Sequence, residues 1–148
     1  MSFHAPLMKP RISVVTLGVS DMDRAVRFYR DGLELPMRDD KPPVIYFELQ
    51  GTWLALYPRE RLASFAGIDP TGRQPGDGES RDRGFGGMTL SVNVDARAAV
   101  DAVMHGAERA GANVTRTPHE FSWGGYAGWF QDPDGHAWEI VYNPRPFM

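Results

Sequence analysis

A single carboxylate near the end of the chain is the clearest candidate for chemistry. Glu139 lies in the apolar segment Ala137 to Tyr142, where strand alternation turns it away from Trp138 and Ile140. A carboxylate in a partly apolar cleft is suited to accepting or donating a proton. The alternative is a structural carboxylate paired with an arginine or a backbone amide. The sequence leaves both interpretations open.

The four histidines offer a second source of proton or metal chemistry. His4 lies in the N-terminal segment, His105 on an expected helix and His136 in an expected turn, which favours surface or turn roles. His119 precedes an aromatic segment that leads into an expected strand, and it is retained as a candidate ligand contact. The chain has no cysteine, so disulfides and thiolate metal sites are excluded.

Aromatic residues gather around three glycines in the second half of the chain. Aromatic rings offer a large contact area, and glycine lets a ligand or another chain approach the backbone. Trp123 and Tyr126, at the entry of a strand, are predicted ligand contacts. Phe121 and Trp129 are interpreted as core or dimer-interface residues. The glycines are Gly124, Gly125 and Gly128.

The first half of the chain predicts the order strand, helix and three strands. A strand from Ile12 to Val19 leads to Asp21, a natural helix N-cap, and Gly32 is well placed to end the helix. The three strands that follow are expected at Leu33–Met37, Val44–Leu49 and Thr52–Tyr57.

The second half predicts the same order. A strand from Gly87 to Val94 is followed by Asp95 as a possible N-cap, and an apolar helical stripe ends before Gly111. Because the order repeats, we interpret the chain as a duplication. The last three strands are expected at Asn113–Thr117, Gly125–Gln131 and His136–Tyr142, the final two joined by a turn at Asp132–Gly135.

These halves predict one domain over residues 1–148, with modules at about 11–58 and 87–144. Between them, residues 59–86 form a linker or a lid, and the sequence supports both equally. Arg59 to Ala66 has the pattern of a short helix, whereas Gly67 to Gly84 is rich in Gly, Pro, Asp and Arg.

Strand alternation also selects further candidate contacts. One face of each first strand is expected in the core, namely Val15, Leu17 and Val19 in the first half and Met88, Leu90 and Val92 in the second. The opposite faces point to the cleft. The candidate contacts on cleft faces are Thr16, Trp53, Tyr57 and Thr89.

Composition limits the partners. The net charge of −3 and the pI of about 5.8 give no support to nucleic acid or a membrane surface as a partner. No apolar run approaches the roughly 20 residues that span a bilayer, and no signal-peptide stretch opens the chain. We therefore expect a cytoplasmic protein.

Two segments carry a resemblance to a known family. They are Leu17–Met22 with Phe28 and Tyr29, and the run Gly128 to Ile140, which contains an aromatic-Asp-Pro-Asp-Gly sequence followed by Glu139. The chain resembles the vicinal oxygen chelate superfamily of glyoxalases, bleomycin-resistance proteins and dioxygenases over about Ile12 to Pro144. The resemblance implies an α+β fold in which two βαβββ modules form a U-shaped cleft, usually in a homodimer.

The resemblance also implies a divalent-metal site, and this chain departs from it. Matching the family pattern places the ligands at Val14, Ala55, Gly87 and Glu139, of which only Glu139 has a donor side chain. One carboxylate does not make a catalytic metal site. We therefore expect no metal cofactor, with a divalent metal as the alternative if the ligand register is shifted.

Three functions remain open on the sequence. The first, which we favour, is a metal-independent protein that binds a small molecule, as bleomycin-resistance proteins do. The second is a glyoxalase-like lyase, an isomerase or a dioxygenase-like enzyme that uses Glu139 as a general base or residual metal ligand. The third is a non-catalytic accessory domain. Fold resemblance alone does not decide between them.

Overall fold

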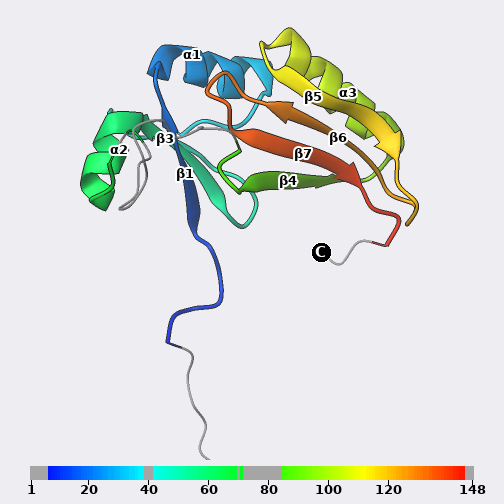
Figure 1. The fold of residues 1–148 in the computed structure, drawn as a ribbon, viewed down its shortest axis with the longest axis horizontal. Coiled ribbons are helices and arrows are strands. Elements are labelled where there is room, and N and C mark those ends of the chain that lie inside the picture. Colours follow the sequence, from blue (N-terminus) through cyan, green and yellow to red (C-terminus); the bar gives the residue numbers. More distant parts are fainter. Residues whose placement is uncertain (1–6, 39–41, 70, 72–84, 146–148) are drawn as a thin grey trace, which may run out of the picture.

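The computed structural model describes residues 7–38, 42–69, 71 and 85–145, which form two mixed β-sheets with α1 and α3 on one side (Figure 1). The first sheet has the order β1-β3-β2 and the second the order β4-β7-β6-β5. The strands are β1 Val14–Val19, β2 Ile45–Phe47, β3 Trp53–Pro58, β4 Thr89–Val94, β5 Asn113–Glu120, β6 Tyr126–Gln131 and β7 Ala137–Tyr142. The helices are α1 Met22–Val26, its π-helical continuation η1 Arg27–Gly32, α2 Arg59–Ala66 and α3 Arg97–Arg109.

The helices begin and end close to the predicted positions. The Asp21 side chain accepts a hydrogen bond from the Arg24 amide at 3.0 Å, so the predicted cap of the first helix is confirmed. The prediction of Asp95 as a cap is wrong. Helix α3 has Ala96 at its N-cap, with no side-chain hydrogen bond, so the burial of its apolar stripe against the second sheet holds it in place.

Both halves contribute to a single core. Leu17, Leu56 and Phe47 from the first sheet join Phe130 and Trp138 from the second. Helical residues complete this core, among them Phe28, Tyr29, Val100 and Met104. The two sheets are thus attached to each other through the side that carries the helices.

The predicted core face of β1 is confirmed, and that of β4 is confirmed only in part. Leu17 and Val19 are buried, and Val15 packs against the core. In the second half only Leu90 packs there, whereas Met88 and Val92 are 60% and 39% exposed. Since β4 is an outer strand of its sheet, α3 covers it less than the inner strands.

One predicted strand is absent. Leu33–Met37 makes only an isolated bridge between Met37 and Phe47. The amides of Leu33 and Leu35 instead donate to Phe28 and Tyr29 carbonyls at the end of η1, and Glu34 has a positive φ of 58°. These bonds keep the segment folded back on the helix.

The architecture is nonetheless the predicted α+β fold with two βαβββ-type modules. The short helix predicted from Arg59 to Ala66 is α2, which packs on β1 so closely that an added Cβ at Gly18 would lie 3.2 Å from the Arg59 Cα. Half of the predicted linker or lid, residues 70 and 72–84, lies outside the described residues.

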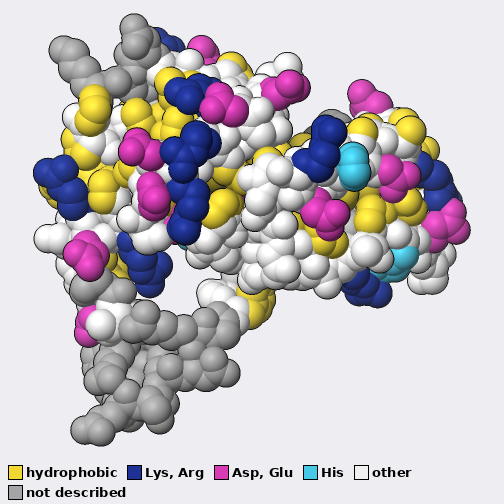
Figure 2. Space-filling view, turned by 90° about the horizontal axis from the view of Figure 1, so that it is seen from above, with side chains coloured by type: hydrophobic (Ala, Val, Ile, Leu, Met, Phe, Trp, Pro, Cys, Tyr) yellow, Lys and Arg dark blue, Asp and Glu magenta, His cyan; other side chains and the backbone are white. Residues whose placement is uncertain are grey.

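The surface of the helix side carries both charge signs. Viewed from above, Lys and Arg side chains are interspersed with Asp and Glu side chains (Figure 2). Among the described residues, no helix is long and apolar enough to cross a membrane.

Candidate functional site

The turn between β6 and β7 holds the two halves together. Asp132, only 3% exposed, accepts a hydrogen bond from the Tyr29 hydroxyl at 2.5 Å, and the Trp138 indole donates to that hydroxyl at 3.0 Å. The other carboxylate oxygen of Asp132 accepts hydrogen bonds from the backbone amides of Asp134 and His136. Burial, followed by the Asp132 charge, raises the pKa of Tyr29 far above its usual value, so the phenol stays a donor.

A second set of contacts joins the same turn to the start of the first helix. Asp134 Oδ1 accepts the Ser20 amide at 2.8 Å and forms an ion pair with Arg24 at 3.2 Å. His136 Nε2 donates to the Gly18 carbonyl at 2.8 Å. The Asp-Pro-Asp-Gly sequence therefore has a structural role, which fixes the start of β7 and with it Glu139.

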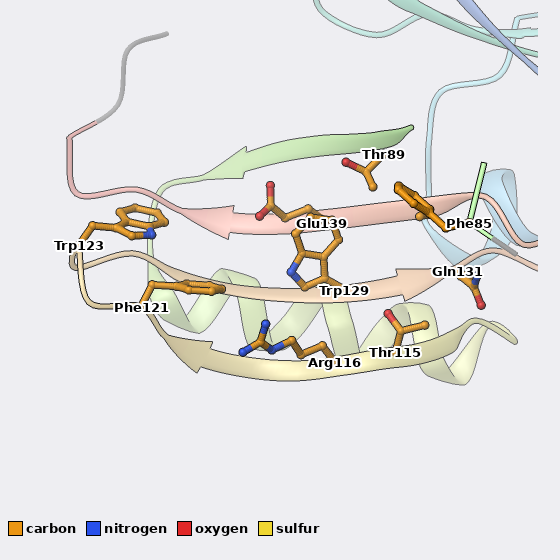
Figure 3. A pocket seen from close by; sticks show the side chains of 10 residues that line it. Phe85, Thr89, Thr115, Arg116, Phe121, Trp123, Trp129, Gln131 and Glu139 are labelled. Carbon is orange, nitrogen blue, oxygen red and sulfur yellow. The ribbon is translucent and has the colours of Figure 1, made fainter. Parts of the chain in front are cut away.

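A cavity of about 580 Å³ lies on the face of the second sheet opposite α3 (Figure 3). All four strands of that sheet contribute lining residues, and among the described residues Phe85 is the only one that precedes β4. The lining residues are Phe85, Thr89, Thr115, Arg116, Phe121, Trp123, Trp129, Gln131, Ala137 and Glu139.

Glu139 points into this cavity, as strand alternation predicts. It lies opposite Ser91 on β4 and Trp129 on β6. The Ser91 hydroxyl donates to Glu139 Oε1 at 2.7 Å. In the described part of the chain Glu139 has no ion pair with lysine or arginine, so its carboxylate is held by a neutral donor.

Trp129 and Arg116 extend the row that begins at Glu139. Arg116 lies opposite Trp129 on the neighbouring strand. Its guanidinium lies 5.6 Å from the centre of the Phe121 ring. The indole of Trp129 therefore forms the floor of the cavity between an acidic and a basic side chain (Figure 3).

Stacked rings form one wall of the cavity. Phe121 and Trp123 are stacked at 5.8 Å with an interplanar angle of 15°, and His119 lies 4.4 Å from Phe121. Gly125 makes room for this wall, because an added Cβ would lie 1.8 Å from the Trp123 indole. The hairpin between β5 and β6 thus presents an aromatic surface to the cavity.

The structure brings together only some of the predicted contacts. Thr89, Trp123 and Glu139 line the cavity. His119 lies on the same face beside Phe121, with its Nδ1 bonded to the Thr117 carbonyl. Tyr126 lies on the other face, where its hydroxyl donates to Asp101 of α3 at 2.6 Å.

The candidate contacts of the first half lie apart from the cavity, on the first sheet. Thr16 pairs with Ala55, the ring of Trp53 packs against Tyr46 and Arg38, and the ring of Tyr57 packs against Phe65 of α2. The pairing of β1 with β3 places Thr16, Trp53 and Tyr57 on the same face of the first sheet, as predicted. None of the three is among the described residues that line the cavity.

Several lining residues were missed or assigned differently from the sequence. Trp129 and Phe121 line the cavity, although the sequence favoured core or interface roles for them. Trp129 could have been found from its pairing with Glu139, since paired residues share a face. Arg116 could not have been found in this way, because the register of β5 shifts on both sides of it and the alternation of faces is lost there.

The residues present do not fit the metal site that the family resemblance implies. Val14, Ala55 and Gly87 have no metal-binding atom in their side chains, Ala55 is fully buried, and Gly87 precedes the start of β4. No group of three or more His, Cys, Asp or Glu side chains within the described ranges could hold a metal ion. Neither His119 nor His136 joins Glu139 in such a group.

Comparison with known proteins agrees with this fold. A glyoxalase-related enzyme from Fulvimarina pelagi is 31% identical, with a TM-score of 0.78 over 92% of this chain and 90% of that chain. A family enzyme from Burkholderia phytofirmans PsJN is 17% identical, with a TM-score of 0.72 over 89% and 98%. A lactoylglutathione lyase from Agrobacterium tumefaciens is 23% identical, with a TM-score of 0.64 over 92% and 96%.

Comparison with curated protein sequences gave no significant match. The family model of the glyoxalase/bleomycin resistance protein/dioxygenase superfamily matches residues 11–140, which is most of the chain. The chain therefore belongs to the glyoxalase/bleomycin resistance protein/dioxygenase superfamily.

Proposed function

We propose that this protein binds a small, largely aromatic molecule on the open face of its second sheet, without a divalent metal. The observation that carries the proposal is the cavity above Trp129, with an aromatic wall on one side and mainly apolar surface. Its volume of about 580 Å³ falls within the range of small-molecule sites.

The polar groups of the cavity are well placed to orient a ligand. Arg116 and Glu139 carry the only charges among the described lining residues. Gln131, which accepts from the Asn113 side chain at 3.2 Å, and two threonines supply neutral hydrogen-bonding groups. Apolar contact then provides most of the binding free energy, and the polar groups provide the specificity.

Truncating the floor of the cavity tests this proposal. Trp129→Ala should weaken every compound found by screening aromatic fragments against the wild type by about tenfold or more, because it removes the indole that forms the floor of the site. The measurement is titration calorimetry of each hit. Phe65→Ala, which truncates an exposed ring on α2, is the matched control. Hits that bind both variants equally would refute the site.

Metal titration tests the second part of the proposal. Because Glu139 is the only donor at the implied ligand positions, chelator-treated protein should bind no stoichiometric Ni²⁺, Zn²⁺, Mn²⁺ or Fe²⁺ in calorimetry. Fragment affinities should be the same with and without these ions. A tightly bound ion that is lost in Glu139→Ala would contradict metal independence.

We further propose that a second copy of the chain covers the open side of the cavity. Residues 7–13 run away from both sheets (Figure 1), and Leu7, Met8 and Ile12 in this arm are 106%, 76% and 68% exposed. The cleft face of the first sheet, with Trp53, does not line the cavity formed by the described residues of its own chain. A symmetric dimer would use both surfaces.

The dimer proposal predicts a solution mass near twice 16.5 kDa. Ile12→Glu should shift sedimentation velocity toward the monomer, since it replaces an exposed apolar side chain of the arm with a charged one. Ala102→Glu, on the exposed face of α3, is the control and should leave the dimer intact. A wild type that sediments as a monomer at all concentrations would contradict the proposal.

A further inference from the structure

Two opposite charges flank the floor of the cavity in a single row across the second sheet. Trp129 lies opposite both Arg116 and Glu139, on the two neighbouring strands. Adjacent strands are about 4.8 Å apart, so the Cα atoms of the two charged residues are about 10 Å apart. A flat molecule lying on the indole would therefore have one end at Arg116 and the other at Glu139 (Figure 3).

Both charged groups can still bind a ligand. Within the described ranges Arg116 forms no ion pair, and its guanidinium packs only over the Phe121 ring. An arginine can bind a carboxylate with two parallel hydrogen bonds while it stacks on a ring. Glu139 accepts one hydrogen bond from Ser91 through Oε1, which leaves acceptor capacity on the carboxylate.

The surroundings favour a planar ligand. The stacked rings of Phe121 and Trp123 stand beside the row, with an interplanar angle of 15°. A conjugated ring system can contact this wall and the Trp129 floor together, whereas a branched aliphatic molecule cannot match both flat surfaces.

We propose that the ligand is a planar aromatic or conjugated acid that carries a hydroxyl or amino group at the end opposite its acid group. This rests on the proposed function and names its ligand class. The acid group binds Arg116, and the hydroxyl or amino group donates to Glu139. An ionised carboxylate only accepts hydrogen bonds, so a ligand with a second acid group would be repelled at Glu139.

Three naphthalene probes test this ligand class. 6-Hydroxy-2-naphthoate has both groups, 2-naphthoate lacks the hydroxyl, and 2-naphthol lacks the acid. In titration calorimetry, 6-hydroxy-2-naphthoate should bind most tightly. Each probe with a single polar group should bind about tenfold more weakly or worse. The variants to test are Arg116→Gln and Glu139→Gln. The matched controls are Arg109→Gln and Glu108→Gln, at exposed positions in the last turn of α3.

The variants should act on different probes. Arg116→Gln should weaken both naphthoates by about tenfold and leave 2-naphthol unchanged, because only the acids contact the guanidinium. Glu139→Gln should weaken 6-hydroxy-2-naphthoate and leave 2-naphthoate unchanged or tighter. The control variants should bind all three probes as the wild type does. Melting temperatures of all variants establish that they are folded.

The outcomes separate this inference from the proposed function. Equal affinity of the wild type for the three probes, or equal losses in both variants, would overturn the ligand class. Absence of probe binding, together with Trp129-dependent binding of other fragments, would overturn the ligand class and leave the proposed function intact. Fragment binding that does not depend on Trp129 would overturn the proposed function itself.

Discussion

Replacing Asp132 by alanine should lower the free energy of unfolding by about 3–5 kcal/mol. The carboxylate is 3% exposed and accepts from the Tyr29 hydroxyl and from the amides of Asp134 and His136. Its removal leaves these donors without their partner inside the protein. A buried donor without a partner costs about 1–3 kcal/mol. Urea denaturation followed by circular dichroism measures the loss.

Two further variants locate the effect. Tyr29→Phe keeps the ring but removes the hydroxyl between Asp132 and Trp138, so it should destabilise by a smaller amount, about 1–3 kcal/mol. Asp31→Ala breaks an exposed ion pair with Arg30 and should have little effect. If Asp132→Ala were no more destabilising than Asp31→Ala, the buried network would not hold the halves together.

Gly32→Ala should destabilise the protein by about 1–3 kcal/mol, although alanine is usually the better helix residue. Gly32 ends η1 against the C-terminal end of α3, where an added Cβ would lie 2.4 Å from the Ala110 Cβ. Neither atom can move without shifting backbone. The new methyl group therefore forces the two helix ends apart.

A double mutant tests this explanation. Ala110→Gly in the Gly32→Ala background removes the opposing methyl group and should restore much of the lost stability in urea denaturation. Gly106→Ala is the matched control, because nothing lies within 4 Å of its added Cβ, and it should be neutral or stabilising. Additive effects of the two substitutions would show that the contact is not the cause.

Local sequence signals predicted most of the fold. Asp21 caps the first helix because its side chain reaches an amide three residues away, an interaction that needs no tertiary context. The stripe of α3 is likewise local, since Val100, Met104 and Ala107 share one helical face. Glu139 was placed in the cleft by strand alternation alone, and its side chain lies there.

Features that depend on contacts distant in the sequence were not predictable. The irregular register of β5 breaks the alternation that would have placed Arg116. Phe85 reaches the cavity from a segment with no periodic pattern. The Leu33–Met37 segment has the composition of a strand, but the amides of Leu33 and Leu35 donate hydrogen bonds to the preceding helix instead of to a neighbouring strand.

The indole N–H resonances of the four tryptophans give the most direct test of the account. Trp129 and Trp123 line the cavity, Trp138 is buried in the core and Trp53 lies on the first sheet. Aromatic fragments titrated into ¹⁵N-labelled, chelator-treated protein should shift the Trp129 and Trp123 signals most. Binding that shifts only Trp53, or that requires an added divalent ion, would contradict a metal-free site on the second sheet.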